Sequence, residues 1–145
     1  MRPVLLLCCA LSFTACTRGG EQAGGEAATL NLADVAGKWT IHGMAEGSDS
    51  VLITYELNAT ATTEGWTTTL PGREPMALHV ITGGDSVMTH VGPFESVLRP
   101  GVQVTTESAS RLVNGQLEGW TVAHYQGVAG ADSVARLRIR GTRAP

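Results

Sequence analysis

The sequence predicts an all-β protein, a single small antiparallel up-and-down barrel of about eight strands. Runs of alternating apolar and polar residues recur through residues 31–145, and short segments rich in turn-forming residues separate them. No segment has convincing helical periodicity, apart from one short turn at residues 31–36 and another at 94–98. Sequential strands with short connections favour a barrel, which closes its own edges; an open β-sandwich is the alternative.

Residues 1–15 have the pattern of a signal peptide. Arg2 is followed by an apolar run at residues 4–11 and then by small residues. The run is too short to cross a membrane, which takes roughly 20 residues. The ending FTAC, residues 13–16, resembles the lipobox of bacterial lipoproteins, although Phe13 stands where that family usually carries Leu. The resemblance implies lipidation of Cys16; an ordinary secretory signal with an incidental cysteine is the alternative.

The cysteine positions fit this interpretation. The three cysteines are Cys8, Cys9 and Cys16, and none follows residue 16. A chain cleaved before Cys16 keeps one sulfur, which would carry the lipid, so no disulfide is expected in the folded part. We therefore expect a membrane attachment through an N-terminal lipid in the bacterial cell envelope. The folded domain would then lie in the periplasm or at the cell surface.

Residues 16–30 predict a flexible tether, because Gly, Ala and Glu dominate the segment. The barrel domain is expected over residues 31–145. The whole chain has a formal net charge of −3. This mildly acidic balance does not favour nucleic acid or an anionic membrane surface as a partner.

The strands follow from alternation and from turn residues. Pro71-Gly72 ends the third run, and Asn114-Gly115 is a strong signal for a two-residue hairpin turn. In the last run, Leu137 and Ile139 alternate with Arg138 and Arg140. The expected strands lie near residues 38–45, 51–58, 66–70, 76–82, 86–91, 101–113, 116–125 and 133–140.

The start of the predicted barrel, VAGKW at residues 35–39, resembles the opening of lipocalin and broader calycin barrels. In that family a short helical turn leads into a strand marked Gly-x-Trp, matched here by Gly37 and Trp39. The resemblance implies that Trp39 plugs one barrel end and that a late basic residue, Arg138 or Arg140, packs across it. Trp39 as an ordinary core aromatic is the alternative. Avidin-like barrels have a similar opening, but no counterpart of their ligand residues is found.

A Gly-x-Asp-Ser-Val motif occurs three times, at residues 47–51, 83–87 and 130–134. Each copy stands directly before or at the start of a predicted strand. Gly tolerates positive φ, and Asp and Ser bond nearby backbone, so the motif is typical of a turn. A serine nucleophile would need a general base and an orienting group, or a strand-to-helix elbow. No such elbow is present, and a turn is the favoured interpretation.

Two further features leave alternatives open. A tight turn near Gly84 would place His79 and His90 on one face of a hairpin, as the start of a metal site completed by His42, His124 or a carboxylate. Solvent-facing histidines are the favoured interpretation, so we expect no metal or other cofactor. Residues 91–101, with two prolines and two glycines, predict either a connection over a barrel end or a lid.

The sequence leaves three candidate functions for the predicted barrel. The calycin resemblance implies a lipid-anchored barrel that binds a small, mostly apolar ligand, and the ligand-binding residues are unknown. The second is a structural or partner-binding envelope lipoprotein of the kind common, and uncharacterised, in bacterial genomes, with no particular protein partner indicated. The third, an enzyme, requires a catalytic or metal-binding cluster that the sequence does not assemble. We expect a protein that is not an enzyme.

Overall fold

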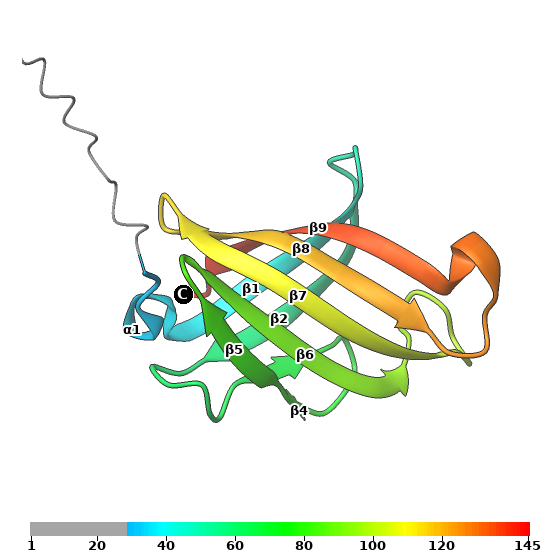
Figure 1. The fold of residues 1–145 in the computed structure, drawn as a ribbon, viewed down its shortest axis with the longest axis horizontal. Helices are drawn as coiled ribbons and strands as arrows, with labels where there is room; N and C mark the ends of the chain where they lie inside the picture. Colours follow the sequence, from blue (N-terminus) through cyan, green and yellow to red (C-terminus); the bar gives the residue numbers. More distant parts are fainter. Residues whose placement is uncertain (1–28) are drawn as a thin grey trace, which may run out of the picture.

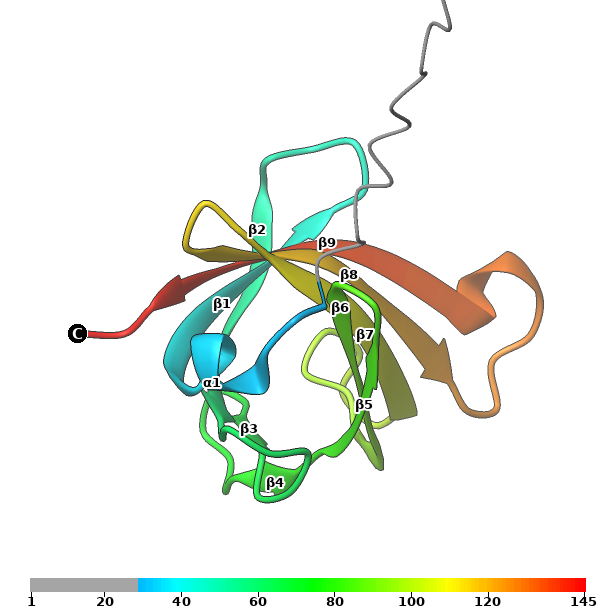
Figure 2. The same cartoon turned by 60° about the vertical axis from the view of Figure 1, so that its left-hand side comes forward.

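The computed structural model describes residues 29–145 and contains one antiparallel sheet of nine strands that curls into a barrel (Figures 1 and 2). The strand order is β4-β3-β2-β1-β9-β8-β7-β6-β5, so every hydrogen-bonded neighbour is also a neighbour in sequence except β1 and β9. The elements are α1 Leu32–Val35, β1 Gly37–Ala45, β2 Val51–Ala59, β3 Thr67–Thr69, β4 Met76–Ala77, β5 His79–Gly83, β6 Ser86–Glu95, β7 Gln103–Val113, β8 Gln116–Tyr125, the 3-10 helix η1 Gly130–Ser133, and β9 Val134–Arg143.

The barrel closes at two places. β1 pairs with β9 along seven residues, from Trp39 opposite Arg143 to Ala45 opposite Leu137. On the other side, β4 pairs with β3 and β5 pairs with β6, and only Leu78 separates β4 from β5. The short strands β4 and β5 therefore form one bent segment that connects β3 to β6. Counted as one strand, this segment gives the barrel wall eight strands. The predicted up-and-down barrel is confirmed, and the open sandwich is wrong.

The first two Gly-x-Asp-Ser-Val copies lie in the turns before β2 and β6, as predicted, whereas residues 130–133 of the third form the 3-10 helix η1. β2 begins at Val51, β6 begins at Ser86 and β9 begins at Val134. Each copy contains a glycine with positive φ, namely Gly47, Gly84 and Gly130. The two-residue hairpin at Asn114-Gly115 is also present, and both residues have positive φ.

The sequence interpretation was wrong at the end of β6. This strand was expected to end near Val91, and a helical turn was expected at residues 94–98. Instead β6 continues to Glu95, with an irregularity in its pairing to β7 between Val91 and Phe94. A bulge at Gly92-Pro93 absorbs the two residues that cannot join the ladder, and the strand then resumes.

Candidate functional site

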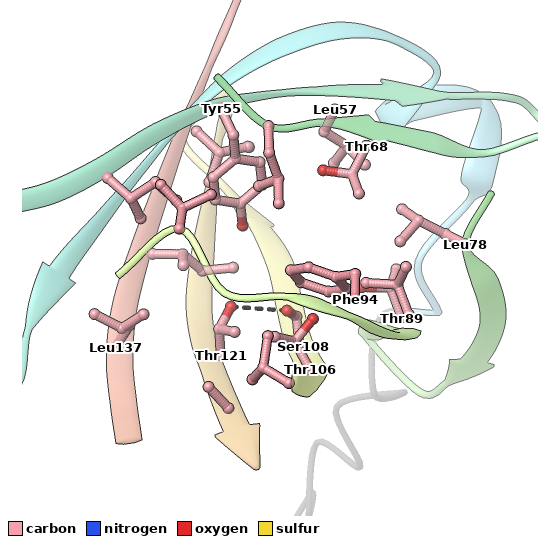
Figure 3. A pocket seen from close by; sticks show the side chains of 18 of the residues that line it. Tyr55, Leu57, Thr68, Leu78, Thr89, Phe94, Thr106, Ser108, Thr121 and Leu137 are labelled. Carbon is pink, nitrogen blue, oxygen red and sulfur yellow. Dashed lines mark hydrogen bonds between the residues drawn. The ribbon is translucent and has the colours of Figure 1, made fainter. Parts of the chain in front are cut away.

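The candidate site is a cavity of about 100 Å³ inside the barrel (Figure 3). Every strand from β1 to β9 except the two short strands β4 and β5 contributes side chains, and Leu78 contributes at the seam between those two. Most of the lining is apolar, with Ile53, Leu57, Phe94 and Leu137 among the larger side chains. The inward positions of the barrel thus leave space that their side chains do not fill, as an eight-stranded barrel allows.

One end of the barrel is closed by Trp39. Its ring is fully buried, its indole nitrogen Nε1 donates to the carbonyl of Val35 at 2.8 Å, and Val35 is also fully buried. The guanidinium of Arg143 lies over the ring, 4.4 Å from its centroid, and donates to the carbonyl of Ala36 at 2.8 Å. Gly37 has a φ of 129°, and a Cβ there would lie 3.0 Å from the same guanidinium. The plug therefore combines α1, the first residues of β1 and the end of β9.

The basic residue across Trp39 is thus Arg143, and the expectation of Arg138 or Arg140 was wrong. Paired residues lie on the same face of a sheet, and Trp39 pairs with Arg143. Arg138 and Arg140 differ from Arg143 by an odd number of positions, so their side chains leave the opposite, outer face. Arg138 binds Asp49 there, and Arg140 lies 3.9 Å from Glu118.

The other end of the barrel is covered by the β6–β7 loop, residues 96–102. Ser96, Val97 and Leu98 all line the cavity. The guanidinium of Arg99 lies over the Tyr125 ring, 4.3 Å from its centroid, and donates to the carbonyl of Asp132 at 2.7 Å. The loop is therefore tied to the end of β8 and to η1. Of the expected connection, residues 91–95 belong to β6 and the remainder covers a barrel end, whereas the lid alternative stays a prediction.

A row of hydroxyl side chains crosses the cavity wall. Thr89 on β6 pairs with Ser108 on β7, and Ser108 pairs with Thr121 on β8. All three side chains line the cavity, and the Ser108 and Thr121 hydroxyl oxygens lie 2.7 Å apart, within hydrogen-bond distance. We call Thr89, Ser108 and Thr121 the hydroxyl row. Thr106 and Ser110, on either side of Ser108 along β7, also line the cavity, so this part of the wall is the richest in hydroxyls.

Tyr55 reaches this row from another part of the barrel. It lies on β2, which is separated from β8 in the sheet by β1 and β9. Figure 3 shows its hydroxyl directed toward Thr121 and Ser108. Burial raises the pKa of Tyr55 from 10.0 to about 12, and a hydrogen bond with Thr121 opposes part of that rise. The phenol is thus held in its neutral form.

Burial of Tyr55 predicts an alkaline loss of stability. Between pH 10.0 and about 12 the unfolded chain releases the phenolic proton while the folded chain retains it, so the free energy of unfolding falls as pH rises. The stabilisation is complete below pH 10.0, and its loss amounts to about 3 kcal/mol. Urea unfolding of wild type and Tyr55→Phe across this range should show a steeper decline for wild type. Parallel declines would contradict the assignment.

The cavity lining carries no charge. Among residues 29–145, the side chains that line it are aliphatic, aromatic or hydroxyl-bearing, and no Asp, Glu, Lys, Arg or His is included. Glu107, Arg111 and Glu118, on two of the same strands, lie on the outer face. The interior is therefore a low-polarity space whose polar side chains are all hydroxyl-bearing, with Tyr55 and the hydroxyl row among them.

The histidines lie outside this site. His79 and His90 are directly opposed on β5 and β6, as one of the two possible registers predicted, and both are exposed. His42 Nδ1 lies 3.0 Å from the Thr54 hydroxyl oxygen, and His124 is also exposed. Within the described part of the chain, no group of three or more His, Cys, Asp or Glu side chains is arranged to hold a metal ion.

The outer face of the barrel carries a row of apolar residues. Ile81 pairs with Met88, Met88 with Ala109, and Ala109 with Trp120. Ile81, Met88 and Trp120 are 51, 41 and 47% exposed. We call these four residues the outer row. An exposed apolar line across four neighbouring strands is a feature of surfaces that bind other molecules.

The signal peptide, Cys16 and most of the tether fall outside the described residues 29–145, so their assignments stay predictions. Of the helices in residues 29–145, none has the length and apolar character needed to span a membrane. Comparisons with protein-family models, with curated proteins and with solved structures found no match for this chain.

Proposed function

We propose that this chain is a lipid-anchored protein of the bacterial cell envelope whose barrel binds a small, mostly apolar molecule. The observation that supports the proposal is the interior cavity, which is lined mostly by apolar side chains and includes residues of the β6–β7 loop in its wall. Small-molecule sites are commonly apolar cavities with a few well-placed polar groups. Burial of the ligand's apolar surface would supply most of the binding free energy.

The cavity volume limits the size of the ligand. About 100 Å³ is below the roughly 300–1,000 Å³ of pockets that take drug-sized molecules. It is closer to the roughly 150 Å³ of an engineered apolar cavity that binds benzene. The ligand is therefore compact, on the scale of a single ring or a short branched chain.

Binding without catalysis fits the polar groups of the cavity. A serine or threonine nucleophile needs a general base within hydrogen-bond reach. The polar partner of Ser108 is the Thr121 hydroxyl, and the Tyr55 hydroxyl is directed toward Thr121; its raised pKa keeps the phenol protonated. These groups orient a bound molecule through hydrogen bonds, and none of them is prepared to remove a proton at neutral pH.

Filling the cavity should abolish ligand binding and leave the fold intact. Ala123 lines the cavity and is 5% exposed. Its replacement by leucine adds three carbons to a space of about 100 Å³. Native mass spectrometry of protein purified from bacterial envelopes should show a retained small molecule on wild type and none on Ala123→Leu.

Ala109→Leu is the matched control, because Ala109 is exposed on the outer face. This variant should retain the molecule as wild type does. Wild-type protein that carries no small molecule, or equal retention by Ala123→Leu, would contradict the proposed function.

A second candidate, binding of a protein partner in the envelope, is favoured by the outer row. A photo-reactive amino acid at Trp120 should then cross-link one defined partner in intact cells, and the same group at Arg136 should not. Arg136 is exposed on the outer face of β9, outside the outer row. No adduct, or the same adducts from both positions, would contradict this candidate.

A further inference from the structure

We infer that the cavity selects a neutral ligand with a hydroxyl or carbonyl group, which binds at Tyr55 and the hydroxyl row. The inference rests on the proposed function and names the chemical class of its ligand. It follows from three properties of the cavity: the absence of charge in its lining, the arrangement of its hydroxyls, and the apolar surroundings of those hydroxyls.

The uncharged lining excludes anionic ligands. A carboxylate moved from water into a low-polarity space loses its hydration, and this loss is offset only by a cation or several strong donors. Among the described residues, the cationic side chains nearest the two barrel ends, Arg143 and Arg99, are both engaged: Arg143 lies over Trp39 and Arg99 over Tyr125. Neither of them lines the cavity. A fatty acid anion or a phosphate ester would therefore be bound poorly.

The hydroxyls match a neutral polar group. Each hydroxyl offers one donor and two acceptor positions. The Ser108–Thr121 hydrogen bond uses only part of this capacity. A ligand carbonyl can accept from one of these hydroxyls, and a ligand hydroxyl can both donate and accept. Because the row lies on three neighbouring strands and Tyr55 comes from β2, the polar group would be contacted from two sides.

The surroundings of the row demand an apolar body on the ligand. Leu137 on β9 pairs with Thr121 on β8. Val91 and Phe94 follow Thr89 along β6. Leu57 and Leu78 lie on the same cavity wall as Thr68 (Figure 3). A ligand therefore needs an apolar body that packs against these side chains. The class that fits is a compact, neutral alcohol or ketone.

Three probes of nearly equal shape test the inference: cyclohexanol, methylcyclohexane and cyclohexanecarboxylate. Each is titrated into the domain at neutral pH, and the NMR shifts of the cavity methyl groups, Leu137 and Ala123 among them, report binding. Cyclohexanol should bind at least about tenfold more tightly than the carboxylate, because the carboxylate must lose its charge or its hydration. This comparison uses wild-type protein alone and does not depend on any variant folding.

The polar anchor is tested by Tyr55→Phe combined with Thr121→Val. The pair should weaken cyclohexanol binding about tenfold, since the alcohol loses its hydrogen-bond partners, and should leave methylcyclohexane binding unchanged or stronger. Ser110→Ala serves as the control, because Ser110 lines the cavity beside the row without belonging to it. This control should leave the cyclohexanol affinity within about twofold of wild type.

The outcomes separate the inference from the proposed function. A carboxylate that binds as tightly as cyclohexanol would overturn the inference and leave ligand binding intact. Equal losses of cyclohexanol and methylcyclohexane in the double variant would also overturn it. If none of the three probes shifts the cavity methyl groups, the proposed function itself is overturned.

Discussion

Gly119→Ala should destabilise the protein by about 3 kcal/mol or more, or prevent it from folding. Gly119 is an inward position on β8, opposite Ser110 on β7. A Cβ at Gly119 would lie 1.9 Å from the carbonyl oxygen of Ala109 and 2.7 Å from Cα of Ser110. Both contacts are with backbone, so no side-chain rotation relieves them. Glycine at this position lets β8 approach β7 closely, as at the bends of other barrels.

Gly83→Ala is the matched control for this prediction. Gly83 also lies in a strand, but a Cβ there would meet only the terminal methyl of Met88, at an ordinary 3.4 Å. Urea unfolding followed by circular dichroism should give a loss within about 1 kcal/mol for Gly83→Ala. Similar losses for the two variants would show that close approach of β7 and β8 is not required.

Trp39→Ala should cost about 3–5 kcal/mol of unfolding free energy. The substitution leaves a large space at the closed end of the barrel, breaks the hydrogen bond to Val35, and leaves the Arg143 guanidinium without the ring beneath it. Because Val35 is fully buried beside Trp39, the contact between α1 and the barrel should loosen as well. Hydrogen exchange of the backbone amides in residues 32–39 should rise accordingly.

Trp120→Ala provides the comparison, because it removes an indole that is 47% exposed on the outer face. Its unfolding free energy should fall by less than about 1 kcal/mol. A Trp39→Ala variant as stable as Trp120→Ala would contradict the role of Trp39 as the plug. The two variants remove the same number of atoms, so the difference between them measures the burial of Trp39 together with its contacts to Val35 and Arg143.

Much of the fold could be predicted from the sequence, because strand alternation and turn residues are local signals. The Asn114-Gly115 hairpin and the starts of strands at Val51, Ser86 and Val134 lie at or next to the predicted positions. The continuation of β6 past Gly92 was missed. A bulge needs a partner strand to restore the pairing, and that partner is not visible in a local pattern.

The site was less predictable. The choice of Arg138 or Arg140 as the partner of Trp39 overlooked the alternation in the same strand: continuing inward from Ile139 leads through Gly141 to Arg143. The contact between Tyr55 and Thr121 joins β2 to β8, and it depends on how barrel closure brings the two strands together. An available signal was the composition of β7, in which Thr106, Ser108 and Ser110 occupy one face without any charge.

The central claim is that the barrel is hollow and accepts an apolar guest, and crystallography under xenon pressure tests it most directly. Xenon occupies apolar cavities without needing any specific chemistry. We expect one bound xenon position inside the barrel, among Leu57, Phe94 and Leu137, and its loss in Ala123→Leu. A wild-type barrel that binds no xenon because side chains fill its interior would contradict the account.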